Sequence, residues 1–155
     1  MNGLHILADF YACEGERRLL LDTGTLAALC RRACAEAALV VVTEAFHQFP
    51  AAGATGALVL AESHLAIHTW PELDSVTLDL YVCNYSQDNR AAAEIAYNVL
   101  RTEFKPQRIM RRDVSRGDPG ENVPEAGTNN NFCNTVSNNI QNHQGETHEP
   151  DPHHS

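Results

Sequence analysis

Residues 61–72 hold most of the side chains in this sequence that can do chemistry. They read Ala-Glu-Ser-His-Leu-Ala-Ile-His-Thr-Trp-Pro-Glu, so that the Glu62–Ser63 peptide bond is followed five residues later by His68. A serine hydroxyl can attack a neighbouring peptide carbonyl, and histidine can move the proton because its pKa lies near neutrality. Cys83 follows in the next apolar run. The pattern predicts a self-cleaving serine, with a thiol available to the chemistry that cleavage makes possible.

A structural role is the alternative for the same residues. Ser63 and His64 could be solvent-facing strand residues and His68 a hydrogen-bonded core histidine, since short motifs often arise by chance. Strand periodicity adds a condition, because Ser63 and His68 would face opposite sides of a straight strand. A bulge or bend near Glu62 is therefore expected if the two residues act together.

Composition restricts the partners and the compartment. The 155 residues fit one domain, and 20 acidic against 11 basic residues argue against nucleic acid or an anionic membrane as the main partner. A leader segment and an apolar run of about 20 residues are both missing, so we expect a cytoplasmic protein with no membrane segment. The five cysteines are an odd number without metal-type pairing, and reduced thiols are expected.

The only lysine is Lys105, which precedes Pro106 at the end of a helical pattern. Pyridoxal phosphate is held by a lysine Schiff base inside a pocket. Lys105 is badly placed for that role, so this cofactor is not expected.

Residues 118–155 differ in character from the rest. They contain eight asparagines, four prolines, six acidic residues and no basic one. Too few large apolar side chains are present to offset the entropy of ordering, so we expect a disordered tail after a domain of residues 1–117. The tail histidines could bind metal, but scattered histidines usually bind nothing specific, and no metal site is expected (His143, His148, His153 and His154).

Hydrophobic periodicity predicts six strands and two helices in residues 1–117. We expect strands at 4–13, 39–49, 57–61, 64–70, 76–83 and, as an edge strand, 108–114. The helices are expected from an N-cap among residues 22–25 to about Ala38, and over 88–104 with an apolar stripe of Ala92, Ile95, Ala96, Val99 and Leu100. This order indicates an α+β fold, a two-layer sandwich of an antiparallel sheet with two helices on one face. The uncovered face would need a second sheet, so we expect a homodimer in a four-layer αββα arrangement.

From Gly3 to about Val114 the chain resembles the short bacterial and archaeal S-adenosylmethionine decarboxylase proenzymes. The likeness is carried by the run 62–72 and by the run Thr-Leu-Asp-Leu-Tyr-Val-Cys at 77–83. Weaker collinear matches are His5 with Asp9 and Cys13, the run Phe-His-Gln-Phe at 46–49, and the turn with Gly53 and Gly56. The processing motif with its downstream cysteine is the specific part, and the tail lies outside the resemblance.

The resemblance implies that Ser63 becomes a covalent pyruvoyl group. Its hydroxyl would attack the Glu62 carbonyl, and elimination would split the chain into residues 1–62 and a chain that starts at modified residue 63. His68 would be the proton acceptor in processing, supported by Thr55 where the family usually has serine. The pyruvoyl ketone would form a Schiff base with the substrate amine, and Cys83 would be the proton donor in decarboxylation.

The resemblance also implies the substrate site. Glu72 would accept the ribose hydroxyls, Leu65 would line the pocket, and Phe49 and Phe46 are candidates for stacking on adenine and attracting the sulfonium. Alternate aromatic residues in a strand are nonetheless more often core. The product would be the aminopropyl donor for spermidine synthesis.

Two other functions remain open. Pyruvoyl-dependent decarboxylases of arginine or ornithine share this scaffold, and the run 84–89 departs from the family by lacking a glycine after Cys83. A catalytically inactive regulatory subunit is the other possibility, but it would be expected to lose Ser63, His68 or Cys83.

Overall fold

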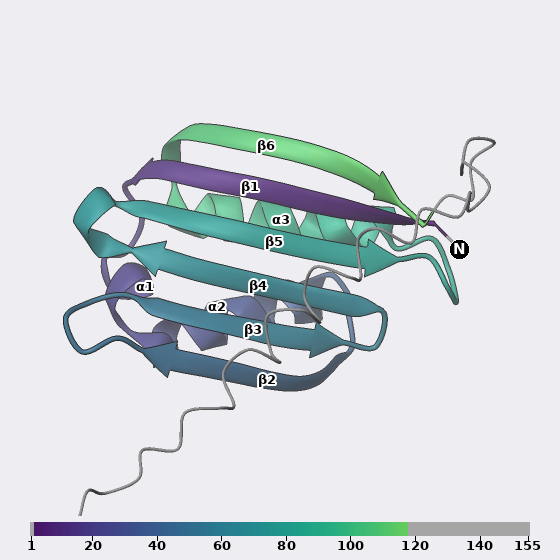
Figure 1. The fold of residues 1–155 in the computed structure, drawn as a ribbon, viewed down its shortest axis with the longest axis horizontal. Helices are drawn as coiled ribbons and strands as arrows, with labels where there is room; N and C mark the ends of the chain where they lie inside the picture. The colour runs from purple at the N-terminus through teal and green to yellow at the C-terminus, as the bar shows by residue number, and fades with distance from the viewer. Residues whose placement is uncertain (1, 118–155) are drawn as a thin grey trace, which may run out of the picture. The chain divides into compact units, whose positions relative to one another are not determined.

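A computed structural model describes residues 2–117, in which a six-stranded sheet lies against one layer of helices (Figure 1). The sheet has the order β2-β3-β4-β5-β1-β6, and every neighbouring pair is antiparallel. The strands are β1 Gly3–Cys13, β2 Val41–Gln48, β3 Ala54–Leu60, β4 Ser63–Trp70, β5 Ser75–Cys83 and β6 Pro106–Arg116. The helices are α1 Arg18–Leu21, α2 Thr23–Glu36 and α3 Arg90–Phe104, and a short 3-10 turn, η1, covers Pro71–Leu73.

The predicted α+β fold, with an antiparallel sheet and helices on one face, is confirmed. The number of helices was wrong, because the single turn α1 is too short to show a helical period in the sequence. The expected tail 118–155, with its histidines and Cys133, lies outside the described residues. No helix within residues 2–117 is long and apolar enough to cross a membrane.

Local chemistry explains where the two long helices begin and which side they bury. Asp22 caps α2, since its carboxylate accepts hydrogen bonds from the backbone N–H of Thr25 at 2.7 Å and from its hydroxyl at 2.6 Å. In α3 the expected stripe was wrong at Ile95, which is 46% exposed. The buried side runs at helical spacing through Ala93, Ala96, Tyr97, Leu100 and Phe104.

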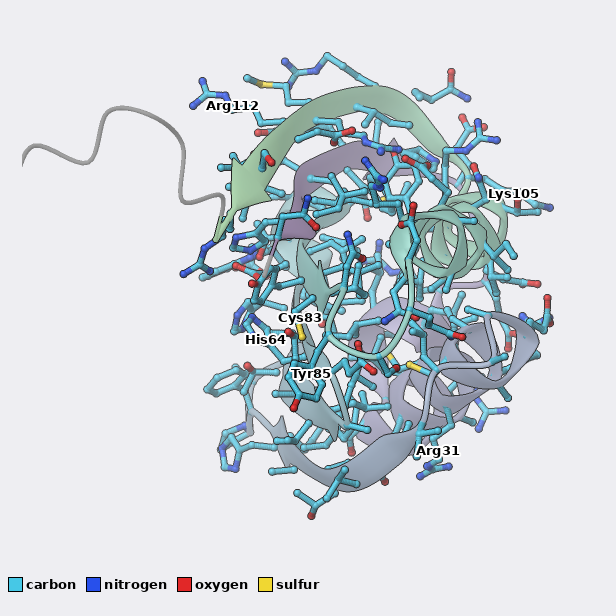
Figure 2. The ribbon with its side chains drawn as sticks, turned by 90° about the vertical axis from the view of Figure 1, so that its right-hand side faces the viewer. Arg31, His64, Cys83, Tyr85, Lys105 and Arg112 are labelled. Atoms are coloured by element: carbon cyan, nitrogen blue, oxygen red, sulfur yellow. The ribbon has the colours of Figure 1, made fainter. Side chains whose placement is uncertain are left out.

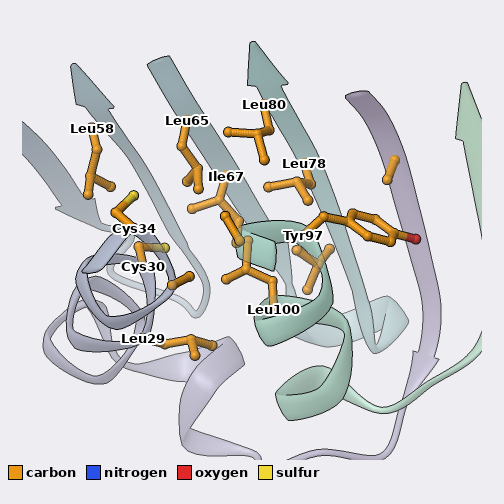
Figure 3. Packing of buried hydrophobic residues seen from close by; sticks show 14 of the residues in the cluster. Leu29, Cys30, Cys34, Leu58, Leu65, Ile67, Leu78, Leu80, Tyr97 and Leu100 are labelled. Carbon is orange, nitrogen blue, oxygen red and sulfur yellow. The ribbon is translucent and has the colours of Figure 1, made fainter. Parts of the chain in front are cut away.

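The core lies between the sheet and the helices (Figure 3). Every second residue of the central strands points into it, following the period of two that a pleated strand imposes. These strand residues meet the buried sides of α2 and α3, including Cys30 and Cys34, which lie on one face of α2 as expected. Strand residues of this core are Ile6, Leu58, Leu65, Ile67, Leu78 and Leu80.

The other face of the sheet, the open face, has no covering helix among residues 2–117. Its residues alternate with the core residues and are only half-buried or exposed. They mix polar and apolar side chains, so this face is neither a dry core nor a fully solvated surface. Its members include His5, Leu7, Asp9, Thr55, Ala57, His64, Ala66, His68, Thr77, Asp79, Tyr81 and Cys83.

The start of β3 differs from expectation in a way that matters for the site. Residues 54–56 were expected in a turn, but β3 begins at Ala54, and the turn ends at Gly53 with a φ of 90°. The strand is longer because Gly56 pairs with Phe46, whose ring covers the position where a side chain would otherwise stand. Thr55 is therefore a strand residue opposite His68.

Replacing Gly56 by alanine should destabilise the fold. The new Cβ would lie 2.0 Å from the Phe46 Cδ1 atom, so the ring must leave its place. We expect the free energy of unfolding to fall by about 1–3 kcal/mol, the usual range for an overpacked core, in urea titrations. Gly24→Ala is the control. Gly24 lies in α2, and the added Cβ would contact only the Asp22 carboxylate, at 3.4 Å. A Gly56→Ala protein as stable as the control would contradict this packing.

Candidate active site

The Glu62–Ser63 bond lies at the tightest point of the β3–β4 hairpin. Leu60 pairs with Ser63, so only Ala61 and Glu62 form the turn. Ser63 has a φ of 108°, a region that residues with side chains rarely adopt. Such a conformation costs on the order of 1–3 kcal/mol. Ser63 itself thus departs from extended strand geometry, next to the place where the motif required a bend.

The carbonyl of Glu62 is hydrogen-bonded across the sheet. The backbone N–H of Cys83 donates to this oxygen at 3.3 Å, because β5 runs beside the start of β4. An N–H group in this position stabilises negative charge that develops on the oxygen during attack at the carbonyl carbon. The backbone at Cys83 therefore favours addition to this particular carbonyl.

The side chain of Glu62 is held by the segment that follows β5. Its carboxylate accepts from the backbone N–H groups of Tyr85 at 3.1 Å and Ser86 at 3.4 Å, from the Ser86 hydroxyl, and from Asn89 Nδ2 at 2.7 Å. These donors, the Ser86 hydroxyl first, lower the pKa of Glu62 below its usual value. The residue before the scissile bond is fixed through both its backbone and its side chain.

His68 and Thr55 form a second pair on the open face. The Thr55 hydroxyl and His68 Nδ1 are 2.6 Å apart, and the two residues face each other in the β3–β4 register. This contact leaves Nε2 of the exposed His68 ring as the nitrogen able to exchange a proton with another group. Thr55, which stands where the family usually has serine, thus contacts His68 through its hydroxyl.

The two groups of residues do not meet within one chain. Ser63 and His68 stand five residues apart on β4, which is roughly 16 Å at the usual strand rise of about 3.3 Å per residue. Cys83 instead lies beside Ser63, because Val82 pairs with Ser63 across β4 and β5. The structure brings Ser63 together with Glu62 and Cys83, and His68 together with Thr55.

A pocket of about 530 Å³ adjoins the His68 end of the open face. It is lined by Phe49, Thr55, His68, Trp70 and Glu72, among others, so four sequence-predicted site residues share it. Trp70 was missed, although strand alternation from His68 places it on the same face, and its side chain is 47% exposed. An aromatic wall with one carboxylate suits a ligand that has an aromatic ring and hydroxyl groups.

Two expected pocket residues lie elsewhere. The ring of Phe46 covers Gly56 and packs against the core, and the side chain of Leu65 is fully buried beneath the helices. Neither side chain lines the 530 Å³ pocket. Any contact of Leu65 with a ligand on the open face would have to come from its backbone.

Hydrogen bonds to α1 fix the end of β4, where the pocket closes. The Thr69 hydroxyl donates to the Leu20 carbonyl oxygen at 2.8 Å and accepts from the Ala54 N–H at 2.8 Å. Arg17 donates to the Pro71 carbonyl oxygen at 3.1 Å and pairs with Asp74. The helix turn that the sequence pattern missed therefore anchors the strand end that presents Trp70 and Glu72.

Three further open-face side chains converge on one another at the β1, β4 and β5 strands. His5 Nε2 and His64 Nε2 lie 2.7 Å and 3.1 Å from the same Asp79 carboxylate oxygen. Their ligand-type atoms all fall within 4.8 Å of one another, so this trio is a candidate for holding a metal ion. Without an ion, each imidazole is held by the carboxylate. Sequence reasoning did not single out this trio, because the three residues come from β1, β4 and β5.

The thiols differ from one another in burial, and the single lysine lies apart from Cys83. Burial raises the pKa of Cys34 to about 11 and that of Cys30 further still, whereas Cys83 is half-buried on the open face. Lys105 lies on the helical side of the sheet, away from His64 and Cys83 (Figure 2). Of these groups, only Cys83 is hydrogen-bonded to the Glu62–Ser63 junction, through its backbone N–H.

Comparisons with known proteins agree with the sequence resemblance. The family model described as S-adenosylmethionine decarboxylase matches residues 4–117. The S-adenosylmethionine decarboxylase proenzyme of Thermoplasma volcanium is 37% identical over 116 residues, covering 75% of this chain and 85% of the relative. That of Acidithiobacillus ferrooxidans is 37% identical over 115 residues, covering 74% and 82%. The crystal structure of the adenosylmethionine decarboxylase from Aquifex aeolicus aligns with a TM-score of 0.69 at 34% identity, covering 77% and 94%.

Proposed function

The chain belongs to the S-adenosylmethionine decarboxylase family, and from this premise we propose that it cuts itself between Glu62 and Ser63 and then decarboxylates S-adenosylmethionine. The observation that carries the proposal is the scissile junction itself. A strained Ser63 follows a carbonyl that already accepts the Cys83 N–H. Ser63, His68 and Cys83 are all retained, which disfavours an inactive regulatory subunit.

Self-cleavage would proceed in two stages at this junction. The Ser63 hydroxyl attacks the Glu62 carbonyl carbon, the C–N bond breaks, and the nitrogen takes up the proton, giving an ester and a free amine. A base then removes the Cα proton of residue 63, and the Cβ–O bond breaks. The leaving group is the main-chain carboxylate of Glu62, which becomes the new C-terminus of the first chain. Addition of water and loss of ammonia leave a ketone at residue 63. Relief of the strained φ at Ser63 would favour the first stage.

The chain's own residues fit this product. A pyruvoyl ketone supplies an electron sink for decarboxylation of an amino acid, the task for which other enzymes bind pyridoxal phosphate. Cys83 lies beside residue 63 and is the natural group to return a proton after CO₂ leaves. Phe49 and Trp70 offer aromatic faces to the adenine and the sulfonium, and Glu72 offers a carboxylate to the ribose hydroxyls.

The separation of Ser63 from His68 supports a proposal in which two copies share each site. Consider a homodimer with the open faces packed together and a two-fold axis between the sheets, perpendicular to the strands. The strands of one copy then run opposite to those of the other copy. The His68 end of one sheet then covers the Ser63 end of the other. We therefore propose that His68 and Thr55, with the pocket around Glu72, act on Ser63 and Cys83 of the partner copy. This arrangement would also bury the uncovered open face.

The first expected outcome is self-cleavage. Intact-mass analysis of purified protein should show two polypeptides, the second beginning at a blocked residue 63 that has lost the serine amine. Ser63→Ala removes the nucleophile and should remain a single chain. A wild-type chain that stays whole after long incubation would contradict the proposal.

The second expected outcome concerns the substrate. Release of CO₂ should be seen with S-adenosylmethionine and not with arginine or ornithine, because the pocket offers aromatic faces and one acceptor for hydroxyls. The named relatives give no support to the basic amino acids. Preference for arginine or ornithine would favour the alternative function.

The Cys83→Ala variant tests the proton donor. It should keep its pyruvoyl group yet lose about 10²–10⁴-fold in turnover, the usual contribution of a general acid.

The third expected outcome tests action between copies. Neither Ser63→Ala nor His68→Ala protein should process alone. The two variants are then refolded together. In a mixed dimer, the Ser63→Ala subunit supplies His68 to the intact Ser63 of the His68→Ala subunit. Cleavage should therefore return, and only in the His68→Ala chain. Two differently tagged chains make the cleaved subunit identifiable by mass. Cleavage that never returns, in a mixture shown to contain mixed dimers, would place His68 outside the shared site.

A further inference from the structure

We propose that Asn89 is a positioning residue for self-cleavage, which holds Glu62 and Cys83 in one fixed relation across the scissile bond. The inference rests on the proposed function and adds a residue that lies outside the cleavage motif. Asn89 is the last residue before α3, in the run 84–89 where the chain departs from its family pattern.

The side chain of Asn89 joins the two sides of the junction. Its Nδ2 donates to the Glu62 carboxylate at 2.7 Å and to the Cys83 carbonyl oxygen at 2.9 Å. The Cys83 N–H in turn donates to the Glu62 carbonyl oxygen. One amide group thus closes a ring of contacts around the peptide bond that Ser63 would attack.

The geometry of Asn89 is specified from all sides. The residue is only 4% exposed, its Oδ1 accepts from Gln87 Nε2 at 3.1 Å, and its backbone N–H donates to Asn84 Oδ1 at 2.9 Å. A buried amide with both of its ends satisfied has little freedom to move. Tyr85 lies at the same end of the sheet as Cys83, as Figure 2 shows.

Asn89 gives up a stabilising role to make these contacts. Asparagine at the residue before a helix normally accepts a backbone N–H of the first turn. Asn89 occupies that place, yet its side chain makes no capping hydrogen bond. The described residues also place no arginine or lysine in hydrogen-bond contact with the Glu62 carboxylate. Neutral donors orient this carboxylate, so their geometry, including that of Asn89, decides where Glu62 stands.

The test is the rate of self-cleavage in freshly made chain, followed by intact mass. Asn89→Ala should process about 10–100-fold more slowly, since small displacements of reacting groups have effects of this size. Asn98→Ala is the matched control on the exposed side of α3, where Asn98 donates only to the Glu94 carbonyl oxygen. It should process at the wild-type rate.

An exchange of partners separates positioning from loss of folding. Asn89→Asp places a second carboxylate against Glu62 and should be slow at pH 7. It should recover relative to wild type toward pH 5, where one of the paired carboxyls protonates and becomes a donor. Adding Glu62→Gln to Asn89→Asp supplies an amide donor to the introduced carboxylate and should restore part of the rate at pH 7. The facing titratable groups are Glu62 and Cys83, with Asp88 held by Arg90.

Each outcome decides the matter. Asn89→Ala and Asn89→Asp chains that cleave at the wild-type rate would overturn the positioning role while leaving the proposed function intact. Equal loss in every variant, with no recovery at low pH or with Glu62→Gln, would reduce Asn89 to a structural residue and also overturn it. A wild-type chain that never cleaves would instead refute the proposed function.

Discussion

The register of the β3–β4 hairpin is the constraint on which the rest of the site depends. Pairing of Leu60 with Ser63 leaves two residues for the turn and places Thr55 opposite His68. Because side chains alternate along a strand, a slip of one residue would send Leu65 and Ile67 out of the core and bring His68 into it. Burial of Leu65 and Ile67 therefore fixes the register that positions the site residues, although neither side chain lies at the site.

The same register concentrates strain and hydrogen bonds on one peptide bond. Ser63, the residue directly after the two-residue turn, has a positive φ, and the neighbouring strand β5 supplies an N–H to the carbonyl before it. The segment after β5 then returns to hold the Glu62 side chain on its way into α3. Strand β5, the β3–β4 turn and the start of α3 thus all contribute to positioning the Glu62–Ser63 bond.

The open face explains why one copy of the chain is an incomplete catalyst under the proposed function. Cys83 lies at one end of it, beside the backbone of Ser63, and His68 lies at the other end, separated by the length of a strand. An antiparallel sheet cannot shorten this distance, because strand rise is fixed by backbone geometry. Under the proposed function, the Ser63 end of one copy lies against the His68 end of another. This packing would also cover apolar residues such as Leu7 and Ala57. Assembly and catalysis would then depend on the same surface.

The sequence by itself determined the order of the elements, the antiparallel sheet and the two long helices, because periods of two and of 3.6 are local properties of the chain. It also determined the motif at Ser63 and the match of Thr55 to a family position, since residue type and spacing carry these. It did not reveal α1, the exposure of Ile95, the burial of Leu65 or the place of Trp70 in the pocket. A single turn such as α1 is too short to show a period, and the other three depend on which elements pack against each residue.

Only the tertiary structure decided which side chains meet. The contacts of Asn89 with Glu62, and of Asp79 with His5 and His64, join residues that lie 27, 74 and 15 positions apart. Strand pairing between distant segments creates such neighbours, and no local pattern records it. Pairing of β4 with β3 and β5 likewise decided what lies beside each end of the Ser63–His68 segment: Val82 beside Ser63, and Thr55 with Thr77 beside His68.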